Sequence, residues 1–76
     1  MEQAYVLVQT QVGRSSEVAA ALAAVPGVVL AEDVTGPYDV IARVEAVTTS
    51  ELGRLVSGRV QGVEGITRTV TCTVVA

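Results

Sequence analysis

The chain has 76 residues, of which 50% are hydrophobic and 17% are charged, and its formal net charge at pH 7 is −3. A disordered tail is excluded because such tails are poor in apolar residues. A nucleic-acid interface needs clustered positive charge, whereas the arginines here are scattered and lysine is absent. Histidine, the commonest general base and a frequent metal ligand, is also absent. We therefore expect no enzyme, no metal site, no other cofactor and no direct contact with nucleic acid.

Size and cysteine content predict how the protein is stabilised. A chain this short has room for one domain, residues 1–76, and cores of such domains rarely supply more than about 3–5 kcal/mol. The single cysteine, Cys72, excludes an internal disulfide, so we expect oligomerisation to add the missing stability. No apolar stretch is long enough to span a membrane, and Met1-Glu2-Gln3 lacks the basic start of a signal peptide. We expect a cytoplasmic protein.

The first half of the chain predicts a strand, a helix and a strand. Residues 4–9 are apolar and β-branched, which is typical of a strand. Either Ser15 or Ser16 is expected to cap a helix over residues 17–25, which a Pro-Gly pair ends. Residues 28–35 predict the second strand.

A short turn at Gly36-Pro37 then predicts an antiparallel hairpin. The third strand is expected from Tyr38 to about Glu45, with alternate residues on one face. That face is predicted to hold Tyr38, Val40, Ala42 and Val44.

The second half continues with a helix and a strand. Thr48 and Glu51 form a capping box, in which each side chain can accept from the other residue's backbone N–H. The apolar stripe of this helix is predicted to be Leu52, Leu55, Val56 and Val60. The last strand alternates, with an apolar row at Ile66, Arg68, Val70, Cys72 and Val74 and a threonine row at Thr67, Thr69, Thr71 and Thr73.

The order β-α-β-β-α-β predicts the fold class. A displacement of 35 residues superimposes the halves, placing Val6 on Ile41 and Gly27 on Gly62. Two such units form a ferredoxin-like α+β sandwich, a four-stranded antiparallel sheet with both helices on one face. We expect the threonine row on the uncovered face, packed against a second copy, and Cys72 as a buried, inert thiol.

Residues 30–44, together with Gly62-Val63 and Thr67-Arg68-Thr69, resemble the ligand-binding (RAM) domain of the Lrp/AsnC family of feast/famine transcription regulators. The resemblance rests on the Gly-x-Tyr-Asp hairpin at Gly36, Tyr38 and Asp39, followed by a Thr-x-Thr strand. It implies a domain that binds an amino acid or similar metabolite and assembles as a homodimer, enlarged to an octamer or decamer. Members usually carry an N-terminal helix-turn-helix domain, so this chain resembles a stand-alone ligand-binding domain.

The hairpin is the candidate ligand site. Asp39 offers a counter-ion for an ammonium group, and the amides of Gly36 and Tyr38 offer donors to a carboxylate. Pro37, a departure from the family pattern, removes one such donor. Thr67 and Thr69 are further polar candidates implied by the Thr-x-Thr match. The alternative is a plain turn with a solvated Asp.

The function expected from these features is small-molecule sensing linked to transcription regulation. Two alternatives stay open: a structural partner that co-assembles with a full-length DNA-binding relative, or a small enzyme of the dimeric α+β barrel type. Adjacent strand residues Glu32 and Asp33 point to opposite faces, so they cannot join one carboxylate metal site. No partner for Arg68 follows from the sequence.

Overall fold

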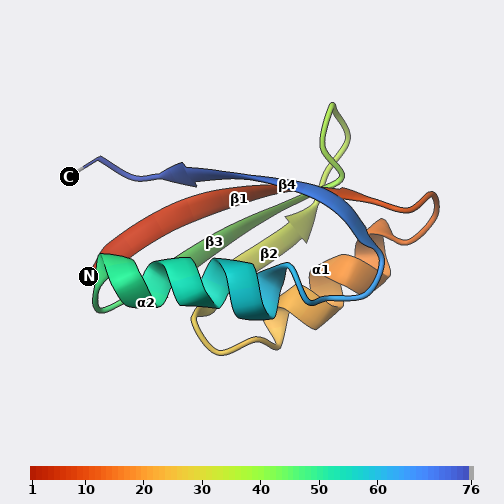
Figure 1. Cartoon of the computed structure of the whole chain (residues 1–76). Coiled ribbons are helices and arrows are strands. Elements are labelled where there is room, and N and C mark those ends of the chain that lie inside the picture. Colours follow the sequence, from red (N-terminus) through yellow and green to blue (C-terminus); the bar gives the residue numbers. More distant parts are fainter. Residues whose placement is uncertain (76) are drawn as a thin grey trace.

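The computed structural model describes residues 1–75, which form a four-stranded antiparallel sheet with the helices on one face (Figure 1). The strand order is β2-β3-β1-β4. The expected ferredoxin-like fold is therefore confirmed. In chain order the elements are β1 (Glu2–Thr10), α1 (Ser15–Ala23), β2 (Val28–Asp33), β3 (Val40–Ala46), α2 (Thr49–Arg54), η1 (Leu55–Val60) and β4 (Ile66–Thr73). The segment η1 continues α2 as a wider π-helical turn.

The core lies between the helices and the two central strands, β1 and β3. Every second residue of these strands faces the helices. This agrees with the alternation predicted for residues 40–44. Three short helical segments cover that face with small aliphatic side chains, because the chain has no Phe or Trp. The buried set is Ala4, Val6, Val8, Val18, Ala19, Leu22, Val40, Ala42, Val44, Leu52, Val56 and Val60.

The two helices begin differently. Thr48 caps α2 as predicted, since its hydroxyl accepts from the Glu51 amide N–H at 3.1 Å, but the described residues lack the predicted return bond to the Glu51 side chain. The predicted serine cap of α1 is wrong: the helix already begins at Ser15, and the residue before it, Arg14, makes no side-chain cap. Arg14 instead donates from Nε to Glu17 Oε2 at 3.0 Å, and this hydrogen bond lowers the pKa of the Glu17 carboxyl.

The β2–β3 connection is longer than the predicted two-residue turn. β2 ends at Asp33 and β3 begins at Val40, so Tyr38 lies in the connecting loop, residues 34–39, and not in a strand. The loop closes at its base, where the Val34 amide donates to the Asp39 carbonyl at 2.8 Å. In Figure 1 it rises from the sheet on the side opposite the helices.

The predicted faces of β4 are reversed. Arg68 lies opposite Gln9 and Ile66 lies opposite Thr10, so the strand carries one extra residue, Thr67, at a bulge. The bulge turns Ile66 toward the core but shifts every later residue to the other face. Thr69, Thr71 and Thr73 therefore lie on the helix side beside Val8, Val6 and Ala4, and the prediction of an uncovered threonine face is wrong.

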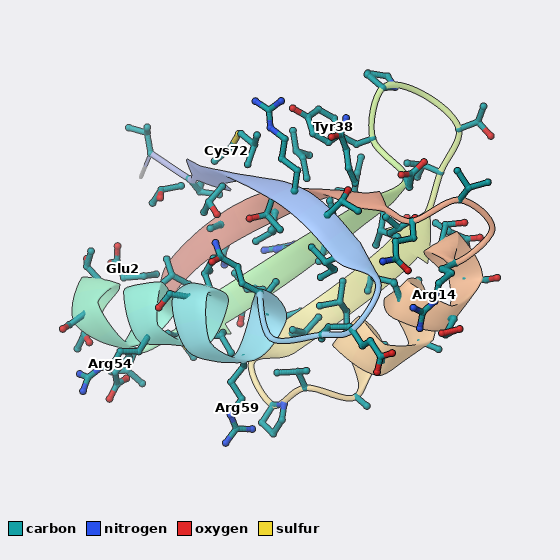
Figure 2. The ribbon with its side chains drawn as sticks, turned by 45° about the vertical axis from the view of Figure 1, so that its right-hand side comes forward. Glu2, Arg14, Tyr38, Arg54, Arg59 and Cys72 are labelled. Carbon is teal, nitrogen blue, oxygen red and sulfur yellow. The ribbon has the colours of Figure 1, made fainter. Side chains whose placement is uncertain are left out.

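On the helix-free side of the sheet, β4 consequently contributes Val70 and Cys72 in place of the threonines, and these lie among polar residues such as Gln9, Arg43 and Arg68. Cys72, predicted to be buried, is exposed there opposite Tyr5. Figure 2 shows Cys72 and Tyr38 on this side, with Arg54 and Arg59 projecting from the helical layer on the other. We call this surface the open face; its apolar members are Tyr5, Leu7, Leu30, Ile41, Val70 and Cys72. Among residues 1–75, no helix has the length and apolar character needed to cross a membrane.

Candidate functional site

The loop 34–39 carries three of the predicted ligand-binding residues. Gly36 is exposed at its tip, whereas Tyr38 and Asp39 are half-buried. Within residues 1–75 the amide N–H groups of Gly36 and Tyr38 donate to no protein acceptor, so both are available to a ligand. Pro37, between them, has no N–H to offer.

Asp39 already has a structural role. Its carboxylate Oδ2 accepts from the Thr10 amide N–H at 2.8 Å and from the Thr10 hydroxyl at 3.4 Å. Its own amide donates to the Val8 carbonyl at 2.9 Å. Asp39 thus fastens the base of the loop to the end of β1, and Oδ1 is the oxygen for which the described residues provide no donor.

The two predicted threonines lie elsewhere in the chain. Thr67 and Thr69 line a hollow of about 230 Å³ that Gln61, Ile66 and Arg68 complete. Gln61, which follows η1, donates from Nε2 to the Thr69 hydroxyl at 3.1 Å, so Thr69 lies on the helix side of the sheet. The loop rises on the opposite side (Figure 1). One chain therefore does not bring its two groups of predicted site residues together.

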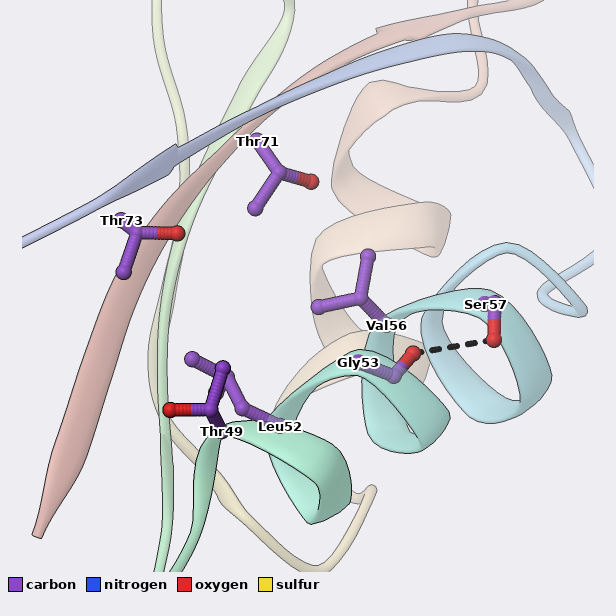
Figure 3. A pocket seen from close by; sticks show the side chains of 7 residues that line it. All are labelled: Thr49, Leu52, Gly53, Val56, Ser57, Thr71 and Thr73. Atoms are coloured by element: carbon purple, nitrogen blue, oxygen red, sulfur yellow. Dashed lines mark hydrogen bonds between the residues drawn. The ribbon is translucent and has the colours of Figure 1, made fainter.

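A second hollow, of about 260 Å³, was not predicted from the sequence. It lies between the α2–η1 helix and the edge strand β4, and Figure 3 shows Thr71 and Thr73 facing the helix across it. Small residues open this space, since Gly53 has no side chain and the Ser57 hydroxyl bends back to the Gly53 carbonyl at 2.9 Å. The feature of the sequence that indicates this hollow is the pair of small residues Gly53 and Ser57, which lie four positions apart on the helix. The lining residues are Thr49, Leu52, Gly53, Val56, Ser57, Thr71 and Thr73.

A metal centre has no support in the described residues: among residues 1–75, no group of three or more Cys, Asp or Glu side chains is placed to hold an ion. Glu32 lies opposite Ile41 and Asp33 opposite Val40, so these two acids face opposite sides of the sheet. The chemistry that the site can offer is hydrogen bonding and charge pairing with a small polar ligand.

Residues 3–76 match the sequence model of the Lrp/AsnC ligand binding domain. The chain belongs to the Lrp/AsnC family. The family resemblance is thereby confirmed. The HTH-type transcriptional regulator FL11 of Pyrococcus horikoshii is 36% identical over 64 residues, which cover 82% of this chain and 42% of that regulator. The chain thus spans less than half the length of this curated relative, which is a transcriptional regulator.

Several solved structures have the same fold as this chain. The hypothetical protein PHS023 from Pyrococcus horikoshii superimposes with a TM-score of 0.92 at 32% identity, covering 100% of this chain and 92% of its own. TTHA0845 from Thermus thermophilus superimposes with a TM-score of 0.91 at 33% identity, and the match covers 100% of this chain and 95% of that protein. The transcriptional regulator NMB0573 from Neisseria meningitidis was solved as an L-Met complex. It superimposes with a TM-score of 0.83 at 18% identity, and the match covers 99% of this chain and 50% of that regulator.

Proposed function

We propose that this chain is a sensing and oligomerisation module for transcription regulation, and that its effector is an amino acid or a similar small metabolite. Membership of the Lrp/AsnC ligand-binding family supports the sensing role. The structure of NMB0573 with L-Met supports the amino-acid class by analogy of fold. The observation that carries the proposal is the loop 34–39, which exposes unpaired backbone donors beside a carboxylate.

The loop suits the two charged groups of a free amino acid. The Asp39 carboxylate is the counter-ion for the ammonium group, through the oxygen that Thr10 does not engage. The amide N–H groups of Gly36 and Tyr38 donate to the carboxylate of the ligand. The Tyr38 ring forms one wall for the ligand's side chain.

The rest of the site comes from another copy of the chain. A single loop cannot enclose a small molecule, because ligand pockets bury most of the surface of what they bind. Within one chain Thr69 lies on the other side of the sheet, and Thr67 lines the same hollow, so we assign their polar contacts to a neighbouring copy. The ligand then lies between subunits.

The open face is the surface that we propose for homodimerisation. Three of its large side chains are substantially exposed in the single chain: Leu30 at 44%, Tyr5 at 42% and Ile41 at 37%. Covering apolar surface contributes about 25 cal/mol per Å². The ring of four or five dimers, an octamer or decamer, is taken from the family resemblance.

A ligand held between subunits must also promote assembly. It binds only the assembled form, so mass action shifts the equilibrium toward that form. At a ligand concentration of about 100 times its dissociation constant, the shift is about 2.7 kcal/mol per site.

Calorimetric titration with the twenty amino acids tests the proposal, with Asp39→Ala and Asp39→Asn as variants. We expect saturable binding that Asp39→Ala abolishes and that Asp39→Asn weakens, because Asn keeps an acceptor for Thr10 but loses the charge. Asp33→Asn, at the exposed end of β2, is the matched control and should bind as wild type does. If no amino acid binds, the sensing role fails and co-assembly with a DNA-binding relative becomes the better account.

A further inference from the structure

Three consecutive residues at the end of β1 hold the loop 34–39. The Val8 carbonyl accepts from the Asp39 amide at 2.9 Å, and the Thr10 amide donates to Asp39 Oδ2 at 2.8 Å. Between them, Gln9 donates from Nε2 to the Pro37 carbonyl at 3.2 Å. The contacts of Val8 and Thr10 fasten the base of the loop. In the described part of the chain, the Gln9 contact is the hydrogen bond that joins the tip, residues 35–38, to the sheet.

The position of Gln9 in the sheet explains how it reaches the tip. Val8 is buried on the helix side, so Gln9, the next residue, points to the open face, where the loop rises (Figure 1). Pro37 has a fixed φ and no N–H, so its carbonyl is the one backbone group that it can offer to a side chain. The donor side chain and the acceptor carbonyl are therefore complementary.

We propose that Gln9 is the positioning residue of the ligand loop: through Pro37 it holds Gly36 and Tyr38, the two amide donors, in their binding arrangement. The link to a ligand rests on the proposed function, whereas the restraint on the loop does not. Gln9 also lies on the open face, so a second copy packed there restricts the same side chain. The order of the loop is thereby coupled to assembly.

Amide hydrogen exchange at Val34 and Asp39 tests this restraint, because their N–H groups are hydrogen-bonded at the base of the loop and exchange when the loop opens. Gln9→Met keeps the length of the side chain but removes the donor, and Gln9→Lys restores a donor of similar reach. An exposed hydrogen bond of ordinary strength predicts roughly 2- to 10-fold faster exchange of these two amides in Gln9→Met. Wild-type exchange is expected in Gln9→Lys.

Gln3→Met is the matched control, since Gln3 lies on the same strand and face and bonds Arg43 and Glu45, away from the loop. It should leave exchange at Val34 and Asp39 unchanged. A second measurement uses Tyr5→Phe as background, in which Tyr38 is the single tyrosine of a chain without Trp. Acrylamide should quench its fluorescence more strongly once Gln9→Met is added.

The outcomes separate the two proposals. Equal exchange in Gln9→Met and Gln3→Met overturns the restraint, whatever binds. Faster exchange in Gln9→Met, with unchanged affinity for whichever of the twenty amino acids binds wild type, overturns the positioning role. A roughly 2- to 10-fold weaker affinity that Gln9→Lys recovers supports it. If wild type binds none of the twenty, the proposed function fails, and the exchange rates alone decide whether Gln9 restrains the loop.

Discussion

Gly27 connects α1 to β2 at a point where no side chain fits. Its φ of +98° is a left-handed backbone conformation that residues with a Cβ rarely adopt. A Cβ built there would lie 2.7 Å from Leu55 Cδ2 and 3.3 Å from the Glu45 carbonyl oxygen. Gly53 is the opposite case, since it lies within α2 with nothing near the position of a Cβ. The two glycines thus differ in what they contribute to stability.

Substitution by alanine should therefore act in opposite directions at these positions. We expect Gly27→Ala to lower the free energy of unfolding by about 1–3 kcal/mol through backbone strain and the clash with Leu55. Gly53→Ala should raise it by about 0.5–1 kcal/mol, because alanine loses less backbone entropy in a helix. Urea denaturation measures both changes. A Gly27→Ala protein that unfolds at the wild-type midpoint would contradict the steric argument.

At the scale of the element, α2 depends on its cap and α1 does not. The Thr48 hydroxyl satisfies the Glu51 amide, one of the donors left free at a helix start. The first turn of α1 relies instead on the ion pair of Arg14 with Glu17 and on packing of Val18 and Leu22. A serine near the start of a helix is therefore not sufficient evidence of a cap.

The two helix starts should respond differently to removal of a hydroxyl. Thr48→Ala is expected to cost about 1 kcal/mol of unfolding free energy. Ser15→Ala, already inside the helix and without a cap bond, should change stability by no more than a few tenths of a kcal/mol. Thermal unfolding followed by circular dichroism distinguishes them. Equal losses of unfolding free energy in the two variants would show that the Thr48 cap does not specifically stabilise α2.

At the scale of the whole molecule, the bulge in β4 determines what the open face offers to a partner. The extra residue Thr67 places Val70 and Cys72 beside Leu7 and Tyr5, so this face carries an apolar cluster instead of a row of threonines. An apolar sheet face favours packing against another sheet more strongly than a row of hydroxyl groups does. The homodimer that we propose gains its driving force from this change.

A charge on the open face should therefore weaken self-association. Ile41→Glu is expected to raise the dimer dissociation constant at least about 10-fold, because burial of an isoleucine side chain contributes roughly 1.5–3 kcal/mol. Val12→Glu is the control, since Val12 is fully exposed in the β1–α1 loop, away from that face. Sedimentation velocity at micromolar concentration reports the masses. A wild-type chain that remains a 7.8 kDa monomer would refute the dimer itself.

The sequence by itself determined the order of the elements, the ferredoxin-like fold, the alternation of Val40, Ala42 and Val44, the cap at Thr48 and the family. These features are local or periodic, so a single chain reveals them. Only the tertiary structure decided which face of β4 meets the helices, because one extra residue reverses a strand whose register depends on a distant partner. Even the 35-residue repeat placed Val6 on Ile41, although Val6 is buried and Ile41 faces the open side.

The candidate site divides in the same way. The sequence placed Gly36, Tyr38 and Asp39 in one hairpin, because neighbours along the chain remain neighbours in space. It did not reveal that Asp39 binds the Thr10 amide or that Gln9 reaches Pro37, since both contacts join segments separated by about thirty residues. Nor did it reveal that the loop and Thr69 lie on opposite sides of the sheet. Such relations depend on strand pairing and on the bulge, which tertiary packing sets.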